Sequence, residues 1–139
     1  MKYAEEINYW KTSSSSPDNW LEKAKKQIVI LGGKILAEMA GTDQDGRAGF
    51  LLAFEIQGEK YKINWPVLPV RNEKDQRAAR IQAATMLYHD IKAKCMSAAV
   101  KGVKVSFFEY YMLPDGRTTV EASYKELMDG IPKLLSWKE

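Results

Sequence analysis

The stretch FLLAFEIQGEKYKINWPVLPVR, residues 50–71, decides the fold that this sequence predicts. Large apolar or aromatic residues recur at every second position along residues 50–57 and again along 60–65, which is the period of a strand with one buried face. The residues on that face are Phe50, Leu52, Phe54, Ile56, Tyr61, Ile63 and Trp65. Gly58 between the two runs is typical of a tight turn. The stretch therefore predicts an antiparallel hairpin with one apolar face and one face that becomes polar and basic toward the turn.

Two prolines follow the hairpin and set its exit. Pro66 has no N–H to donate, so strand pairing is expected to end there. Pro69 keeps Leu68 extended, so the connection should not turn helical too early. We expect Trp65 to lie in the core, and we expect any ligand contact at this exit to come from the basic residues on either side.

Helices are predicted on both sides of the hairpin. The run from Asn72 to Gly102 has apolar residues at three- and four-residue spacing, which predicts a helix of about 28 residues and about 42 Å. Asn72 is suited to cap its start and Gly102 to end it. Near the beginning of the chain, Ser16 as N-cap and Pro17 as first helical residue predict a short helix that ends at about residue 27.

Together the segments predict the order α-β-β-β-α-β-α. The remaining elements are a strand over residues 34–41 with Ile35, Ala37 and Met39 on one face, a turn over 41–49, a strand over 103–113, a turn over 113–116 and a C-terminal helix opened by the capping box Ser123–Glu126. This order predicts an α+β fold, with an antiparallel sheet of about four strands packed by one long helix and with short N- and C-terminal helices. We expect residues 1–15 to form an N-terminal flexible tail and 16–139 to form a single domain.

The composition narrows the classes of function only slightly. The net charge of +3 comes from 21 basic and 18 acidic residues, so the chain permits nucleic-acid binding without requiring it. No apolar run approaches the roughly 20 residues of a membrane span, and the first residues lack the features of a secretory signal, so we expect a cytoplasmic protein without membrane contact. With one cysteine (Cys95) and one histidine (His89), the chain has no means to form an internal disulfide or a Cys/His zinc site.

Several short motifs resemble a family of small uncharacterised proteins carried by bacteriophages and prophages. The matching residues are Gly58, Leu68-Pro69, Ile91-Lys92-Ala93-Lys94, Phe108-Glu109 and the turn Leu113–Thr118. The resemblance covers residues 16–122 and departs from the family at 101–107, where GVKVS replaces a longer acidic link. It implies an origin in a mobile element and a bacterial host cell, and it implies no particular chemistry.

Three motifs with catalytic or ion-binding associations are incomplete. His89 stands alone inside the long predicted helix, and the chain has no nucleophile elbow, so a Ser/His/Asp site is not expected. The run Gly32-Gly33-Lys34 lacks the first glycine and the hydroxyl residue of a phosphate-binding loop. The run Asp43–Gly46 lacks the terminal glutamate of a calcium loop and is better suited to a turn.

A nuclease of the PD-(D/E)xK type is a third hypothesis, because its core has the order α-β-β-β-α-β. Such a site needs an acidic residue on one strand, an acidic residue and a lysine two apart on the next strand, and a divalent metal. The chain offers Glu55, with Lys60 or Lys62 across the turn and Glu22 on the first helix. Glu59 and Lys62 are three residues apart, so they point to opposite faces of a strand and the required pair is missing.

Nucleic-acid binding makes fewer demands on the sequence. It needs basic side chains for the phosphates and, for single strands, aromatic rings on which bases stack. The basic candidates are Lys60, Lys62, Arg71, Arg77 and Arg80, and the aromatic residues on neighbouring strands are Tyr61, Trp65, Phe107, Tyr110 and Tyr111. The sequence thus favours a non-enzymatic, cofactor-free protein that binds nucleic acid, with single-stranded DNA preferred. The alternative is a self-associating accessory protein that works as a homo-oligomer without nucleic acid.

Overall fold

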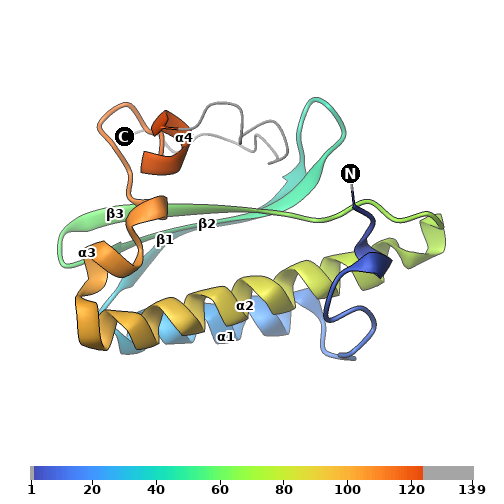
Figure 1. Cartoon of the computed structure of the whole chain (residues 1–139), viewed down its shortest axis with the longest axis horizontal. Coiled ribbons are helices and arrows are strands. Elements are labelled where there is room, and N and C mark those ends of the chain that lie inside the picture. Colours follow the sequence, from blue (N-terminus) through green and yellow to red (C-terminus); the bar gives the residue numbers. More distant parts are fainter. Residues whose placement is uncertain (1, 124–139) are drawn as a thin grey trace.

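The computed structural model describes residues 2–123, and this part of the chain is an α+β unit with a three-stranded sheet and one long helix (Figure 1). The elements are η1 (Ala4–Glu6), α1 (Pro17–Ile30), β1 (Lys34–Thr42), β2 (Ala48–Ile56), β3 (Glu59–Pro66), η2 (Glu73–Asp75), α2 (Gln76–Lys101), α3 (Val103–Ser106), η3 (Phe108–Tyr110) and α4 (Thr119–Ser123). The sheet is antiparallel in the order β1-β2-β3, which leaves β3 at one edge. The predicted α+β class, antiparallel sheet and long helix are confirmed.

The predicted hairpin is formed by β2 and β3, with the predicted apolar face. Tyr61 lies opposite Phe54, and the turn between the strands consists of Gln57 and Gly58, with φ of 55° and 80°. Positive φ at both positions matches the twist of the flanking strands, which is why a short turn of this kind closes the hairpin. The face that carries Tyr61 points toward the helices and forms the main core with them.

α1 and α2 lie side by side on that face and run in the same direction (Figure 1). The ring centroids of Trp20 and Tyr88 are 5.3 Å apart, and seven residues further along both helices Cys95 Sγ lies 3.7 Å from the backbone oxygen of Gln27. The predicted start of α1 is confirmed, because its N-cap Ser16 accepts a hydrogen bond from the backbone N–H of Asn19. No helix in the described part of the chain is both long and apolar enough to span a membrane.

The first strand carries a bulge that changes its predicted faces. The pairing of β1 with β2 shifts between Ile35 and Ala37, because Leu36 is an extra residue in the ladder. Ile35 therefore packs on the helix side, whereas Ala37 and Met39 pack on the outer side against Leu51 of β2. The expectation that Ile35, Ala37 and Met39 share one face was wrong for this reason.

The predicted fourth strand over residues 103–113 is not a strand. Residues 103–110 form α3 and η3, and strand-like pairing is limited to isolated bridges, of which one joins Tyr111 to Tyr61. Val103 and Phe107 are buried while Val105 is 65% exposed, which is the pattern of a helical turn rather than of a strand. The described part of the sheet therefore has three strands, not four. Of the predicted C-terminal helix, residues 124–139 lie outside the described residues.

The N-terminal segment, which was expected to be a flexible tail, makes specific contacts with the unit. Ala4 is fully buried, and its backbone N–H donates to the oxygen of Pro69 at 2.8 Å. The buried Gln82 of α2 donates through Nε2 to the carbonyl oxygens of Ala4, Ile7 and Asn8 at 2.8, 3.2 and 3.0 Å. The side chain of Gln82 thus holds the backbone of residues 4–8 against α2.

Candidate functional site

The structure separates the five basic residues that the sequence groups together. Lys60 and Lys62 lie on β3 beside its turn, whereas Arg77 and Arg80 lie near the start of α2 and Arg71 precedes it. Figure 1 shows the β2–β3 turn and the start of α2 at opposite ends of the long axis. These residues therefore do not form a single binding surface, and their surroundings differ.

Lys62 is buried, not solvated. Its side chain is only 3% exposed, and its Nζ donates to the backbone oxygen of Gly116 at 3.1 Å and lies 3.4 Å from Glu121 Oε1. Both partners belong to the segment that follows η3, so Lys62 attaches that segment to the outer face of β3. A buried ammonium with two partners inside the protein is not accessible to a phosphate. Its neighbour Lys60 lies opposite Glu55 on β2.

Arg71 holds the N-terminal segment. Its guanidinium lies 4.5 Å from the ring centroid of Tyr3, and Nη2 is 2.9 Å from Glu6 Oε1. The backbone N–H of Tyr3 and the guanidinium of Arg71 both hydrogen-bond this carboxylate, and together they lower the pKa of Glu6. The positive charge of Arg71 is therefore already matched by an acidic neighbour.

Arg77 and Arg80 differ from Lys62 and Arg71 in having no acidic partner among the described residues. Both are exposed, as is the preceding Lys74, and none of the three forms an ion pair with another described residue. The first turn of α2 contains no acidic residue. We call Lys74, Arg77 and Arg80 the helix-start cluster. Glu73 and Asp75 of η2 lie directly before α2, and Asp75 pairs with Lys11, so the start of the helix carries acidic as well as basic side chains. Of the cluster, only Arg77 lies in the first turn of α2, where the helix dipole disfavours a cation by about 0.3–1 kcal/mol.

Most of the aromatic residues that the strands were expected to offer to nucleic-acid bases are buried or engaged. Tyr61 and Phe107 are 1% and 0% exposed, and their rings form an edge-to-face pair at 5.8 Å. Tyr110 donates its hydroxyl to Asp90 Oδ2 at 2.6 Å, and Tyr111 donates to Glu59 at 2.8 Å. These rings are components of the core and of its border.

A different aromatic group, which we call the aromatic patch, lies on the helix layer and was not predicted from the sequence. It consists of Tyr9, Trp20, Tyr88 and His89. Tyr9 is 39% exposed and stacks on His89 with ring centroids 5.0 Å apart and planes 14° apart. Lys23 Nζ lies 4.5 Å above the Trp20 ring. The sequence offers no signal for this group, because the residues come from three separate segments.

The residues considered for a nuclease site remain apart. Glu22 belongs to α1 on the helix side of the sheet, where it pairs with Lys25, whereas Glu55 alternates with the core residues of β2 and so points to the other side. Among the described residues, no three His, Cys, Asp or Glu side chains come together in a way that could hold a metal ion. Within that part of the chain, no geometry for metal-assisted hydrolysis is assembled.

The two remaining motifs have structural explanations. A Cβ atom on Gly33 would lie 2.6 Å from Ile28 Cγ2 and 2.9 Å from Ile56 Cγ1, so this glycine permits close packing between α1 and the sheet. Asp43 accepts hydrogen bonds from the backbone N–H groups of Asp45 and Arg47, both at 2.9 Å. The expectation that this run forms a turn is confirmed.

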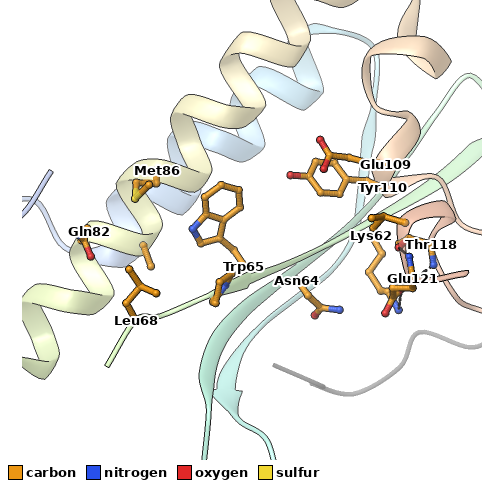
Figure 2. Close-up of a pocket in the computed structure, with 13 residues that line it drawn as sticks. Lys62, Asn64, Trp65, Leu68, Gln82, Met86, Glu109, Tyr110, Thr118 and Glu121 are labelled. Carbon is orange, nitrogen blue, oxygen red and sulfur yellow. Dashed lines mark hydrogen bonds and ion pairs between the residues drawn. The ribbon is translucent and has the colours of Figure 1, made fainter. Parts of the chain in front are cut away.

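A cavity of about 410 Å³, which we call the edge cavity, lies along the open edge of β3 (Figure 2). On the helix side of the strand its walls are Trp65, Leu68, Ala83, Met86 and Tyr110, and on the outer side they are Lys62, Asn64, Thr118 and Glu121. Figure 2 shows Trp65 directed toward Met86 on α2 and Asn64 directed away from that helix. Trp65 is only partly buried and thus contributes both to the core border and to a cavity wall.

Polar groups at the border of the edge cavity are paired, with one exception. Lys94 Nζ lies 2.7 Å from Glu109 and 3.1 Å from Asp90, which also accepts from Tyr110. Burial and the neighbouring Asp90 carboxylate strongly raise the pKa of Tyr110, so its hydroxyl stays protonated and donates. By contrast, the side-chain oxygen of Asn64 is buried and accepts no hydrogen bond from any described residue.

The chain has no match among protein-family models, and neither a curated protein nor a solved structure is significantly similar to it.

Proposed function

We propose that this protein binds nucleic acid without catalysing a reaction on it, and that the helix-start cluster contacts the phosphates. The observation that carries the proposal is the pair Arg77 and Arg80 near the start of a 26-residue helix, which are exposed and form no ion pair with another described residue. A phosphate beside them would gain two exposed guanidinium groups as charged hydrogen-bond donors. Exposed cations that are not used for folding are the minimum requirement for backbone binding.

The aromatic patch supports single strands as the preferred form. Single-stranded nucleic acid is bound by aromatic rings on which bases stack, combined with nearby cations. Tyr9 presents an exposed ring, and Lys11, two residues later, pairs with Asp75 directly before α2. The N-terminal segment therefore links the aromatic patch to the helix-start cluster. A strand that follows this segment would meet phosphate-binding groups and a stacking surface in succession.

The test is fluorescence anisotropy with a labelled oligothymidylate and with a labelled duplex of the same length, across a series of salt concentrations. We expect the single strand to bind more tightly, and we expect its affinity to fall as salt rises because phosphate contacts release counterions. A Tyr9→Ala variant should weaken binding of the single strand by about 1–3 kcal/mol and leave duplex binding unchanged. Absence of any salt-dependent binding at micromolar protein would refute the proposal.

Self-association is a second candidate, favoured by exposed apolar residues on the helix layer. Ile30, Met96 and Val100 are 79%, 67% and 86% exposed. Exposed apolar side chains in one region are typical of protein interfaces. Sedimentation velocity at two concentrations tests this candidate: a homodimer would show a larger sedimentation coefficient at the higher concentration, and Met96→Gln would shift it back to the monomer value.

A further inference from the structure

The edge cavity lies where a fourth strand would continue the sheet. Among the described residues, Tyr61 is the one residue of β3 with a bridge partner on that side, Tyr111, and Met112 N–H donates to the backbone oxygen of Lys60 at 2.8 Å. Past this bridge, no described residue pairs with β3 on its open side. Within residues 2–123, the edge of β3 is thus paired at one end and unpaired along the edge cavity.

The open part of the edge has backbone groups that face outward. Inward and outward hydrogen bonding alternate along an antiparallel strand, and the Lys60 oxygen faces outward because it accepts from Met112. Asn64, four residues later, therefore also directs its backbone N–H and C=O away from β2. Neither group has a backbone partner among the described residues. An unpaired donor and acceptor at a strand edge are a template for another strand.

The two sides of the edge cavity match the alternation of side chains in a strand. Successive side chains of an added strand would point to opposite sides of the sheet. On the helix side they would meet the apolar walls formed by Trp65 and Met86, and on the outer side they would meet Asn64 and Glu121. Asn64 Oδ1 accepts no hydrogen bond from a described residue, so it suits a side chain that donates, whereas Glu121 Oε1 is already engaged by Lys62 and by the N–H of Thr118.

We propose that the open edge of β3 binds an extended peptide segment of a partner protein as a fourth strand. The segment has apolar residues on either side of a lysine, arginine or amide residue, which lies opposite Asn64. A second copy of β3 does not fit this position, because Tyr111 and Met112 already occupy the edge that its remaining residues would need. Strand addition of this kind takes its affinity from main-chain bonds and its specificity from pockets for alternate side chains. This interaction is independent of the nucleic-acid proposal.

The test uses the whole chain and two fluorescently labelled peptides that differ by one methyl group. The first is acetyl-Ser-Leu-Lys-Leu-Ser-amide, and the second has the same sequence with an N-methylated central lysine. N-methylation keeps the side chains and the charge but removes the backbone donor that would bond the Asn64 oxygen. We expect the first peptide to bind and the second to bind at least tenfold more weakly, as measured by fluorescence anisotropy.

A variant of the protein tests the apolar side of the edge cavity. Met86→Trp should fill that space and weaken the first peptide at least tenfold, whereas Ala93→Ser, at an exposed position on the same helix, should leave its affinity unchanged. The proposal is overturned if the two peptides bind equally, or if neither binds to the folded protein at about 1 mM. If Met86→Trp does not fold, the comparison of the two peptides still tests the proposal.

Discussion

Lys62 and Glu121 form an ion pair across the outer face of β3, with 3.4 Å between Nζ and Oε1. The same ammonium donates to the backbone oxygen of Gly116. Lys62 therefore joins the sheet to a segment that is distant in sequence, and its role is structural. Because its ammonium is buried and paired, Lys62 does not belong to a surface that binds a ligand through exposed charge.

We expect Lys62→Met to lower the free energy of unfolding by about 2–3 kcal/mol, because it leaves a partly buried carboxylate and a backbone carbonyl without their donor. Urea denaturation followed by circular dichroism measures the change. Lys74→Met is the control, and as an exposed substitution it should change stability by no more than about 0.5 kcal/mol. Equal stability of the two variants would mean that Lys62 is not structurally important.

Elements whose apolar residues recur with a clear period were predictable from the sequence. Elements whose conformation depends on contacts with distant residues were not. The alternation along residues 50–65 fixed both strands and their faces, because a strand has a period of two and the hairpin is local. Residues 103–113 contain Val, Phe and Tyr, which favour strands, yet Phe107 packs into the core on a helical turn against Phe54 and Tyr61. Strand propensity is weak where tertiary contacts decide the conformation.

The surroundings of the basic residues were predictable from the sequence only where these residues form no ion pair with another described residue. Arg77 and Arg80 lie on a charged helix as predicted, and both are exposed in the described part of the chain. Lys62 was misjudged because its partner Gly116 is 54 residues away in sequence. Similarly, Tyr9 and His89 meet only because the N-terminal segment folds back onto α2. Contacts between distant segments leave no periodic signal in a single sequence.

Gln82 should control the order of the N-terminal segment. We expect Gln82→Leu to destabilise the protein by about 2–3 kcal/mol, because three carbonyl groups lose a buried donor. Hydrogen exchange of residues 3–11 should become faster, and proteolysis should cleave within that range first. The exposed Gln76→Leu serves as the matched control and should leave both measurements unchanged. Unaltered exchange in Gln82→Leu would contradict the assignment.

Stability should fall at alkaline pH, partly through Tyr61. Burial, with a smaller effect of Glu59, raises the pKa of Tyr61 to about 12 in the folded state. In the unfolded chain a tyrosine loses its proton near pH 10, so between about pH 10 and 12 the unfolded state binds fewer protons and is favoured as pH rises.

Urea denaturation at intervals from pH 9 to pH 11.5 measures this loss of stability. Tyr61→Phe has no proton to release at this position, so its stability should decline less steeply over the same window. A parallel decline of the two proteins would show that Tyr61 does not contribute.

Replacing Arg77 and Arg80 by glutamine should weaken nucleic-acid binding and change stability little. Removal of Arg77, which lies in the first turn of α2, should leave the free energy of unfolding unchanged or raise it by about 0.3–1 kcal/mol, and removal of the exposed Arg80 should change it by no more than about 0.5 kcal/mol. If these arginines contact phosphates, affinity for a single strand should fall, and the slope of log K against log salt should decrease in magnitude by about 1.4, or 0.7 for each lost contact. Arg71→Gln is the informative comparison, because Arg71 is paired with Glu6: it should lower stability and leave the salt slope nearly unchanged. Weaker binding with an unaltered slope in the Arg77→Gln/Arg80→Gln protein would show that these residues act on binding in some way other than by contacting phosphates.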